Sequence, residues 1–216
     1  MMARACLFVL AVVAGLHGFA PIADGDLFWN LNVGGWMLDH GALLPAVDPF
    51  TYNAQGAGTP HEWLLQLLFA AVERVGGLIG LRVLGAATCA AAVVLAFAAM
   101  RSAGLSDSLA VVATACWWIV VEPHAVLRPH LVAWLFALAV LGVWFGRESS
   151  AAGAQRTASE SRGDVGRDAV ALFVVCVIWA NAHASVLVVP LYAGLFAVSL
   201  ALRSRFFGQK ALGLRR

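Results

Sequence analysis

Charged residues are scarce in this chain of 216 residues. Lys, Arg, Asp and Glu make up only 12% of the sequence, whereas hydrophobic residues make up 62%. A soluble domain carries about 25% charged residues, so this chain has too little polar surface to cover a water-soluble body of its size. The composition therefore predicts that a lipid bilayer surrounds most of the chain.

The sequence also lacks a cysteine pattern and a strong net charge. Each of the four cysteines lies in a different apolar run, which argues against both a disulfide framework and a zinc site. The formal net charge is only +2, and the basic residues stand in short flanks between apolar runs, as membrane anchors do. We therefore expect no nucleic-acid partner.

Six apolar runs are long enough to cross a membrane, since a span needs about 20 residues and fewer where the helix stops below the surface. The first run also resembles a secretory signal peptide, but its length and the Asp24 that follows it favour a retained anchor. The predicted fold class is all-α, a polytopic transmembrane helix bundle of about six spans. These spans cover residues 5–22, 78–100, 105–121, 130–146, 169–182 and 185–202.

The stretch of residues 169–202 would be about 51 Å long as one helix, at 1.5 Å per residue. That is far more than one crossing needs, and a single helix would leave the basic C-terminal tail outside. A break between Asn181 and Ser185 avoids both consequences and places Asn181 and His183 below the outer surface. Irregular backbone at that depth is tolerated only where it is buried in protein or lines a wet cavity.

The positions of Lys and Arg predict the orientation of the spans. With both termini in the cytoplasm, 11 of the 14 basic residues are cytoplasmic and seven of the 12 acidic residues are outside. The predicted order is a first transmembrane helix (1–23), an external loop (24–77), helices two to four (78–146), a flexible cytoplasmic linker (147–168), helices five and six (169–202) and a basic cytoplasmic tail (203–216).

The external loop is predicted to fold against the membrane, because aromatic residues stand among its polar ones. Residues 27–38 and 61–74 predict two short helices lying in the interface. The alternative for the second is an extension of the next membrane helix, interrupted at Gly76 and Gly77. The aromatic residues are Trp29, Trp36, Phe50, Tyr52 and Trp63.

Asp24 and Asp26 directly follow the first membrane helix. Two carboxylates so close suit a shared divalent cation, such as Mg²⁺ or Mn²⁺, or a pair in which one takes a proton from an acceptor hydroxyl. The alternative is a solvated helix flank.

Ionisable groups near membrane depth tend to mark a site, and other polar residues are expected on the same side: His61, Glu62, Arg128, His130, Asn181 and His183. Arg128 suits a phosphate, which a guanidinium binds bidentately; its alternative is an interfacial anchor without a ligand.

Three segments resemble, in matching order, the bacterial inner-membrane glycosyltransferases of the GT-C superfamily. They are DGDLFWNLNVGGWMLDHGALLPAVDPFTYNAQGAGTPHEWLLQLLFA, LRPHLVAWLFALAVLG and WANAHASVLVVPLYAGL. Those enzymes take a sugar from a polyprenyl-phosphate donor and have a catalytic Asp in the first external loop. The resemblance implies that Asp24 and Asp26 are the catalytic acid pair. It implies substrate-binding roles for His61 and Glu62 in the HEWL element, Arg128 and His130 in the RP element, and Asn181 and His183 at the end of the fifth helix.

The implied function is transfer of a sugar to an acceptor glycan, lipid or protein on the outer side of the membrane. Two features depart from the superfamily: Ala184 and Ser185 stand where related sequences tend to have glycines, and the spans are fewer than in those enzymes. A truncated or inactive form therefore stays open. The alternative function is a non-catalytic membrane protein that binds or moves a lipid-linked glycan.

Overall fold

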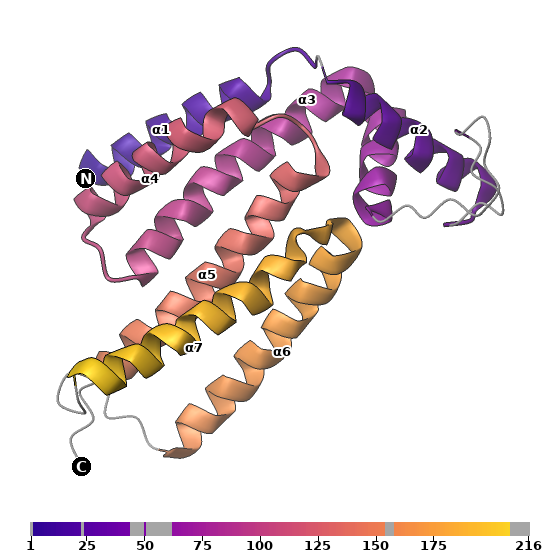
Figure 1. The fold of residues 1–216 in the computed structure, drawn as a ribbon. Coiled ribbons are helices and arrows are strands. Elements are labelled where there is room, and N and C mark those ends of the chain that lie inside the picture. Colours follow the sequence, from indigo (N-terminus) through magenta and orange to yellow (C-terminus); the bar gives the residue numbers. More distant parts are fainter. Residues whose placement is uncertain (1, 23, 44–49, 51–61, 154–157, 208–216) are drawn as a thin grey trace.

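The computed structural model describes residues 2–22, 24–43, 50, 62–153 and 158–207, and its regular secondary structure there is entirely helical, which confirms the all-α class. In chain order the α-helices are α1 (Met2–Gly18), α2 (Gly25–His40), α3 (Trp63–Ser102), α4 (Asp107–Val121), α5 (Pro129–Gly153), α6 (Ala158–Ala182) and α7 (Val188–Phe207) (Figure 1). Two short 3₁₀ helices are η1 (Glu122–His124) and η2 (Ala184–Leu187).

Two helical stretches are long and apolar enough to cross a membrane, Trp63–Ser102 and Pro129–Gly146. Shorter apolar helices cover Met2–Gly18, Ala169–Ala182 and Ala184–Leu195. Large hydrophobic side chains stand exposed on several helices, among them Phe8, Ile119, Phe173 and Leu191, as expected where lipid covers a helix surface. These features support membrane association, and the count of six spans stays a prediction.

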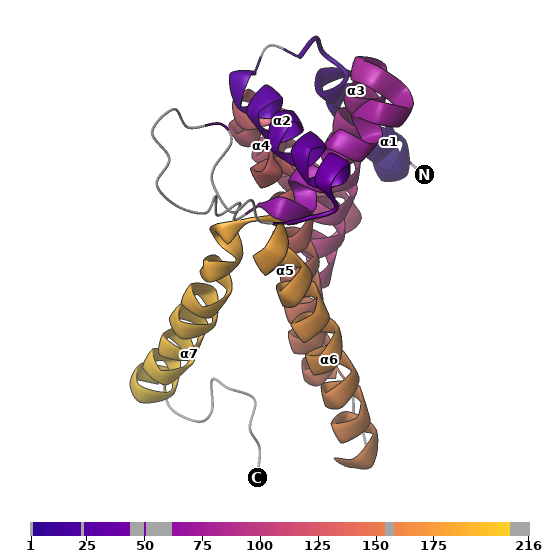
Figure 2. The ribbon, with the colours of Figure 1, turned by 90° about the vertical axis from the view of Figure 1, so that its right-hand side faces the viewer.

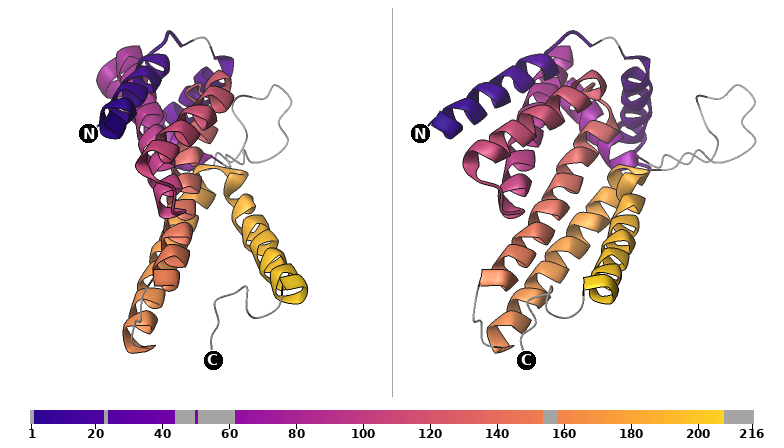
Figure 3. Two further views of the ribbon diagram at one scale, coloured as in Figure 1. Left: turned by 90° about the vertical axis from the view of Figure 1, so that its left-hand side faces the viewer. Right: turned by 60° about the vertical axis from the view of Figure 1, so that its left-hand side comes forward.

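α3 is the central helix and packs against α1, α2 and α5. Its backbone leaves the helical conformation at Gly77, where φ is 59° and ψ is −157°, a region that essentially only glycine adopts. The kink divides α3 into residues 63–76, which lie beside α2, and residues 78–102, which run along α1 and α5 (Figure 3). The predicted interfacial helix and the following membrane helix are thus two arms of one bent element.

Glycines bring α1 and α2 close to α3. A Cβ atom built at Gly18 would lie 2.4 Å from the carbonyl oxygen of Gly85, and one built at Gly34 would lie 2.0 Å from that of Gln66. Small residues allow backbones in membrane proteins to approach in this way. The main apolar core forms around these crossings and includes Leu27, Leu65, Phe69, Leu81, Cys89 and Leu131.

The chain breaks between α6 and α7 at His183, whose φ of −164° and ψ of 140° are extended. η2 then leads into α7, and Figure 2 shows α6 and α7 diverging from this turn. The break predicted between Asn181 and Ser185 is confirmed.

Helix also occupies much of the predicted linker of residues 147–168. α5 continues to Gly153 and α6 begins at Ala158, so the described part of this range is helical where a flexible segment was predicted. Ala, Arg and Glu are good helix formers, and a helix that has already begun is extended at little cost. Of the predicted tail, residues 203–207 belong to α7, and the remainder lies outside the described residues.

We expect Gly34→Ala to lower the free energy of unfolding by roughly 1–3 kcal/mol, because the added methyl meets backbone that cannot move freely. Gly35→Ala is the matched control, since nothing lies within 4 Å of a Cβ built there. It should be neutral or stabilising by up to about 1 kcal/mol through helix propensity. Unfolding of the purified protein followed by circular dichroism measures both, and equal effects would contradict the close contact of α2 with α3.

Candidate functional site

Arg128 joins the two acidic residues of the predicted pair. Its Nε and Nη2 donate to the two carboxylate oxygens of Asp24, the second bond at 2.7 Å, and its Nη1 lies 2.8 Å from Oδ2 of Asp26. The residues are about a hundred positions apart in sequence and meet where α2 and α5 begin. The structure thus brings both acids of the predicted pair to one of the other predicted polar residues, Arg128.

The two carboxylates differ in their surroundings. The side chain of Asp24 is 12% exposed and that of Asp26 is 67% exposed. The hydrogen bond from Arg128 holds the pKa of the Asp24 carboxyl below its usual value, with smaller contributions from the Asp26 backbone N–H and from the charge of His130. The same contact raises the pKa of Arg128. Asp24 is therefore a firmly ionised partner of Arg128, and Asp26 is the more accessible carboxylate.

The start of α2 holds the pair in place. Asp24 is the N-cap of this helix and accepts a hydrogen bond of 3.1 Å from the backbone N–H of Asp26, an arrangement for which Asp is favoured. The Asn30 side chain donates to the carbonyl oxygen of Asp26 at 2.9 Å, and Gln66 donates to Asn30 at 3.0 Å. Asn30 and Gln66 are both 4% exposed, so a buried polar chain connects Asp26 to α3.

A second group of contacts joins the beginning of α3 to the turn between α6 and α7. His183 Nε2 lies 3.2 Å from Oε1 of Glu62, and Trp63 Nε1 donates to Oδ1 of Asn181 at 3.0 Å. The other ring nitrogen of His183, Nδ1, accepts from the backbone N–H of Ser185 at 3.0 Å. A neutral imidazole protonated on Nε2 satisfies both contacts, because it donates to Glu62 and accepts from Ser185.

The remaining predicted residues are placed less centrally. His130 Nε2 donates to the carbonyl oxygen of His124 at 3.0 Å, so this histidine packs against its own loop while its charge acts on Asp24. His61 lies outside the described residues. His17, which is in α1, lies 2.8 Å from Glu122.

Sequence reasoning missed three residues that support these contacts: Asn30, Trp63 and Ser185. Asn30 carried a usable signal, because it is polar and stands one helical turn after Asp26. The other two gave none, since a Trp or a Ser near a helix end has many roles.

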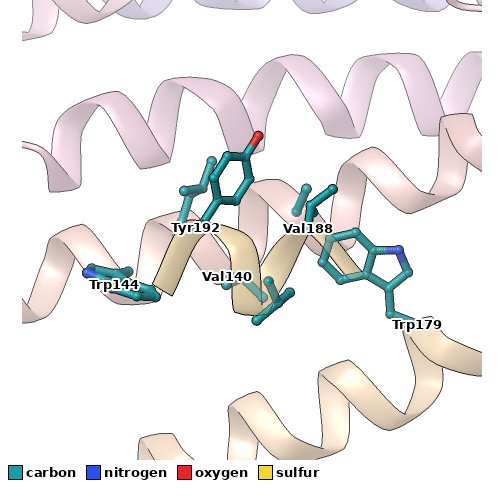
Figure 4. Close-up of a pocket in the computed structure, with 8 residues that line it drawn as sticks. Val140, Trp144, Trp179, Val188 and Tyr192 are labelled. Carbon is teal, nitrogen blue, oxygen red and sulfur yellow. The ribbon is translucent and has the colours of Figure 1, made fainter. Parts of the chain in front are cut away.

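A cavity lies beside the second group of contacts. It lies between α5, α6 and α7, has a volume of about 10 Å³, which is room for no more than one water molecule, and is lined only by apolar and aromatic residues, including Trp144, Trp179 and Tyr192 (Figure 4). Trp179 also donates to the Ser185 hydroxyl at 2.9 Å. This cavity therefore adjoins the α6–α7 turn rather than the acid pair.

A divalent cation fits the acid pair only in part. Carboxylates are suitable ligands for Mg²⁺, but the guanidinium of Arg128 already engages both oxygens of Asp24 and one of Asp26. Among the described residues, no three His, Cys, Asp or Glu side chains are grouped to hold a metal ion. In this arrangement Arg128 supplies the positive charge between the carboxylates, so metal dependence stays a prediction.

Comparison with protein-family models, with curated proteins and with solved structures finds no match. The residues themselves therefore carry the functional inference. Of the predicted site residues, the structure brings together Asp24, Asp26 and Arg128 as one group and Glu62, Asn181 and His183 as another.

We expect the contribution of the Asp24–Arg128 contact to stability to depend on pH. Because the pKa of Asp24 is lowered in the folded protein, the stabilisation is present above the ordinary carboxyl value of 3.8 and is lost as the pH falls below it. Asp24→Asn keeps a good N-cap, so it should cost about 1–2 kcal/mol at neutral pH and much less near pH 3. Unfolding of both proteins across this pH range measures the difference, and a gap that widens on acidification would contradict the assignment.

Proposed function

We propose that the chain is a membrane glycosyltransferase-like protein that transfers a sugar from a polyprenyl-phosphate donor to an acceptor on the outer side of the membrane. The observation that carries the proposal is the meeting of Asp24, Asp26 and Arg128 from distant parts of the sequence. Ionisable groups are costly near lipid. A protein that collects three of them at the ends of different helices gains a place where charge can be bound and a proton moved.

In the proposed step, Asp26 is the general base. The acceptor hydroxyl gives its proton to the Asp26 carboxylate while the acceptor oxygen bonds to the anomeric carbon of the sugar. The bond between that carbon and the phosphate oxygen breaks, and polyprenyl phosphate leaves with the bonding electrons. Asp26 suits this role better than Asp24 because its carboxylate is largely exposed, whereas Asp24 is held by Arg128 as an ionised partner.

Arg128 would bind the donor phosphate in this reaction. A guanidinium has five N–H groups, and the contacts with the two carboxylates use one on each of its three nitrogens. Two N–H groups therefore remain for a phosphate oxygen. Because the charges of Asp24, Asp26 and Arg128 sum to −1, an incoming phosphate also needs further positive charge or a separation of Arg128 from the acids; Mg²⁺ or Mn²⁺ is the cofactor proposed for this purpose.

One observation favours the non-catalytic alternative, in which the protein binds or moves a lipid-linked glycan. All three side-chain nitrogens of Arg128 already contact the protein's own carboxylates. Under this alternative, substitution of the acids alters binding or flux, and no sugar is transferred by the parent protein.

The proposed location is the bacterial inner membrane, with six spans and both termini in the cytoplasm. The support is the charge distribution in the sequence together with the arrangement of the helices. Alternate helix ends gather around α2: the end of α1, the start of α5 and the α6–α7 turn (Figure 1).

We expect Asp26→Asn to reduce sugar transfer by about 10²–10⁴-fold, the usual effect of losing a general base. Asp39→Asn is the matched control, because Asp39 is also an exposed residue of α2 paired with an arginine, Arg74. Transfer of labelled sugar from polyprenyl-phosphate donors to membrane acceptors measures the activity. Absence of transfer by the parent protein, or full activity of the Asp26 variant, would exclude the proposed chemistry.

We expect reporter fusions after Arg101, within residues 147–167 and after Arg203 to be cytoplasmic, and fusions near Asn53 and Glu122 to be external. Each position follows a different predicted span, so the set tests the number of crossings as well as their direction. An external signal after Arg203 would mean that residues 169–202 do not cross twice.

A further inference from the structure

α2 and the first arm of α3 form one packed unit, which we call the cap and define as residues 24–40 and 62–76. The backbones of its two helices lie close together at Gly34 and Gln66. A buried hydrogen bond from the Gln66 side chain to the Asn30 side chain also joins them. Arg74 adds a bond of 2.5 Å to Asp39. Figures 1 and 2 show the two helices lying together at one end of the molecule.

Two short connections attach the cap to the remaining helices, which we call the bundle. One is Gly77, whose non-helical backbone separates the arms of α3. The other follows α1, where residues 19–22 are non-helical. Its first residue, Phe19, is held to the bundle, since Arg82 donates to its carbonyl oxygen at 2.8 Å and stacks on its ring at 4.2 Å. The cap and the bundle are therefore joined by non-helical backbone at both connections.

The ion pairs of Asp24, Asp26 and Glu62 cross the boundary between cap and bundle with the same polarity. Three carboxylates that reach across it, those of Asp24, Asp26 and Glu62, belong to the cap, and their partners Arg128 and His183 belong to the bundle. Carboxylate and phosphate offer the same bidentate oxygen geometry to a guanidinium. The carboxylates of the cap thus offer Arg128 the same oxygen geometry that a phosphate would offer.

From this arrangement we propose that the bundle carries an anion-binding site at Arg128 for a phosphate group, and that the carboxylates of the cap occupy it as a built-in competitor. The cap turns about Gly77, and a phosphate that takes Arg128 releases Asp24 and Asp26. Only a ligand that binds the open form more tightly can shift the cap. A phosphate that touches only the two remaining N–H groups leaves the cap in place, whereas one that binds the guanidinium bidentately in place of Asp24 releases it.

The energetics allow such an exchange. Arg128 is 39% exposed and Asp24 is 12% exposed, so solvent reaches the guanidinium side of the ion pair and weakens it by screening, and a better anion can displace the acids there. Leu65 and Phe69 of the cap pack into the main apolar core, which favours a small rotation over detachment. The release also leaves Asp26 unpaired and able to take a proton, which links the movement to the proposed transfer reaction. This last link rests on the proposed function, whereas the movement itself does not require it.

Distance measurements between two spin labels test the movement directly. Asn32→Cys labels the cap and Ala103→Cys labels the bundle, in the full chain with its four native cysteines replaced by alanine and reconstituted in lipid nanodiscs. We expect farnesyl phosphate to shift the distance distribution and farnesol, which lacks the anion, to leave it unchanged. A measurement with inorganic phosphate distinguishes the two sources of the anion. If inorganic phosphate shifts the distance distribution, the site binds free phosphate; if only farnesyl phosphate does so, the site binds a lipid headgroup.

Two sets of variants identify the parts. Asp24→Asn with Asp26→Asn should shift the distribution without any ligand, because the competitor is removed. Gly77→Ala should also shift it, since alanine does not tolerate φ near +60°, whereas Gly76→Ala, with nothing within 4 Å of its added Cβ, should not. Unchanged distances with farnesyl phosphate, an equal shift with farnesol, or a silent Gly77→Ala would each overturn the proposal. None of these measurements depends on sugar transfer, so an inactive protein with a moving cap would refute only the proposed function.

Discussion

The bend at Gly77 is the constraint on which the other contacts depend. A straight helix of 40 residues would be about 60 Å long and would carry its first arm, residues 63–76, away from the bundle. The bend turns that arm back, so that Trp63 reaches Asn181 and Glu62 reaches His183. It also brings α2 into position, because Gly34 sits directly on the backbone of Gln66. One residue without a side chain thus determines where two clusters of polar groups lie.

Much of the helical architecture could be predicted because lipid imposes a simple rule on a sequence. Where a helix is surrounded by apolar solvent, its whole length must be apolar, and charged residues accumulate at its ends. The break near His183 followed from the same rule, since no single crossing accommodates 34 residues. The rule does not apply to a polar segment. Residues 147–168 have the composition of a linker, yet their described part is helical, because Ala, Arg and Glu also suit a solvated helix.

The candidate site was predictable as a set of residues but not as a set of pairs. Helix ends collect polar groups, and that rule selected Asp24, Arg128 and His183; the structure puts the first two in one group and His183 in another. Composition and spacing contain no information about which carboxylate meets which cation. Pairing Arg128 with both acids requires the relative rotation of α2 and α5, which is set by apolar packing around Leu27 and Leu131. Because the sequence does not reveal this rotation, Arg128 was predicted to bind a phosphate. In the structure Arg128 binds the carboxylates of Asp24 and Asp26.

The distance in sequence between Asp24 and Arg128 has a consequence for biosynthesis. The two residues are separated by 104 positions, so at a synthesis rate of about 5–20 residues per second the acid pair waits roughly 5–20 s before its partner is made. Asn181, which receives Trp63, is made later still. During this interval α2 and the first arm of α3 can associate with each other, with α1, with the second arm of α3 and with α4, but not with α5, α6 or α7. The buried amides of Asn30 and Gln66 give α2 and the first arm of α3 a contact that needs no later part of the chain. The order of synthesis therefore favours a hairpin that forms early and against which α5, α6 and α7 pack later.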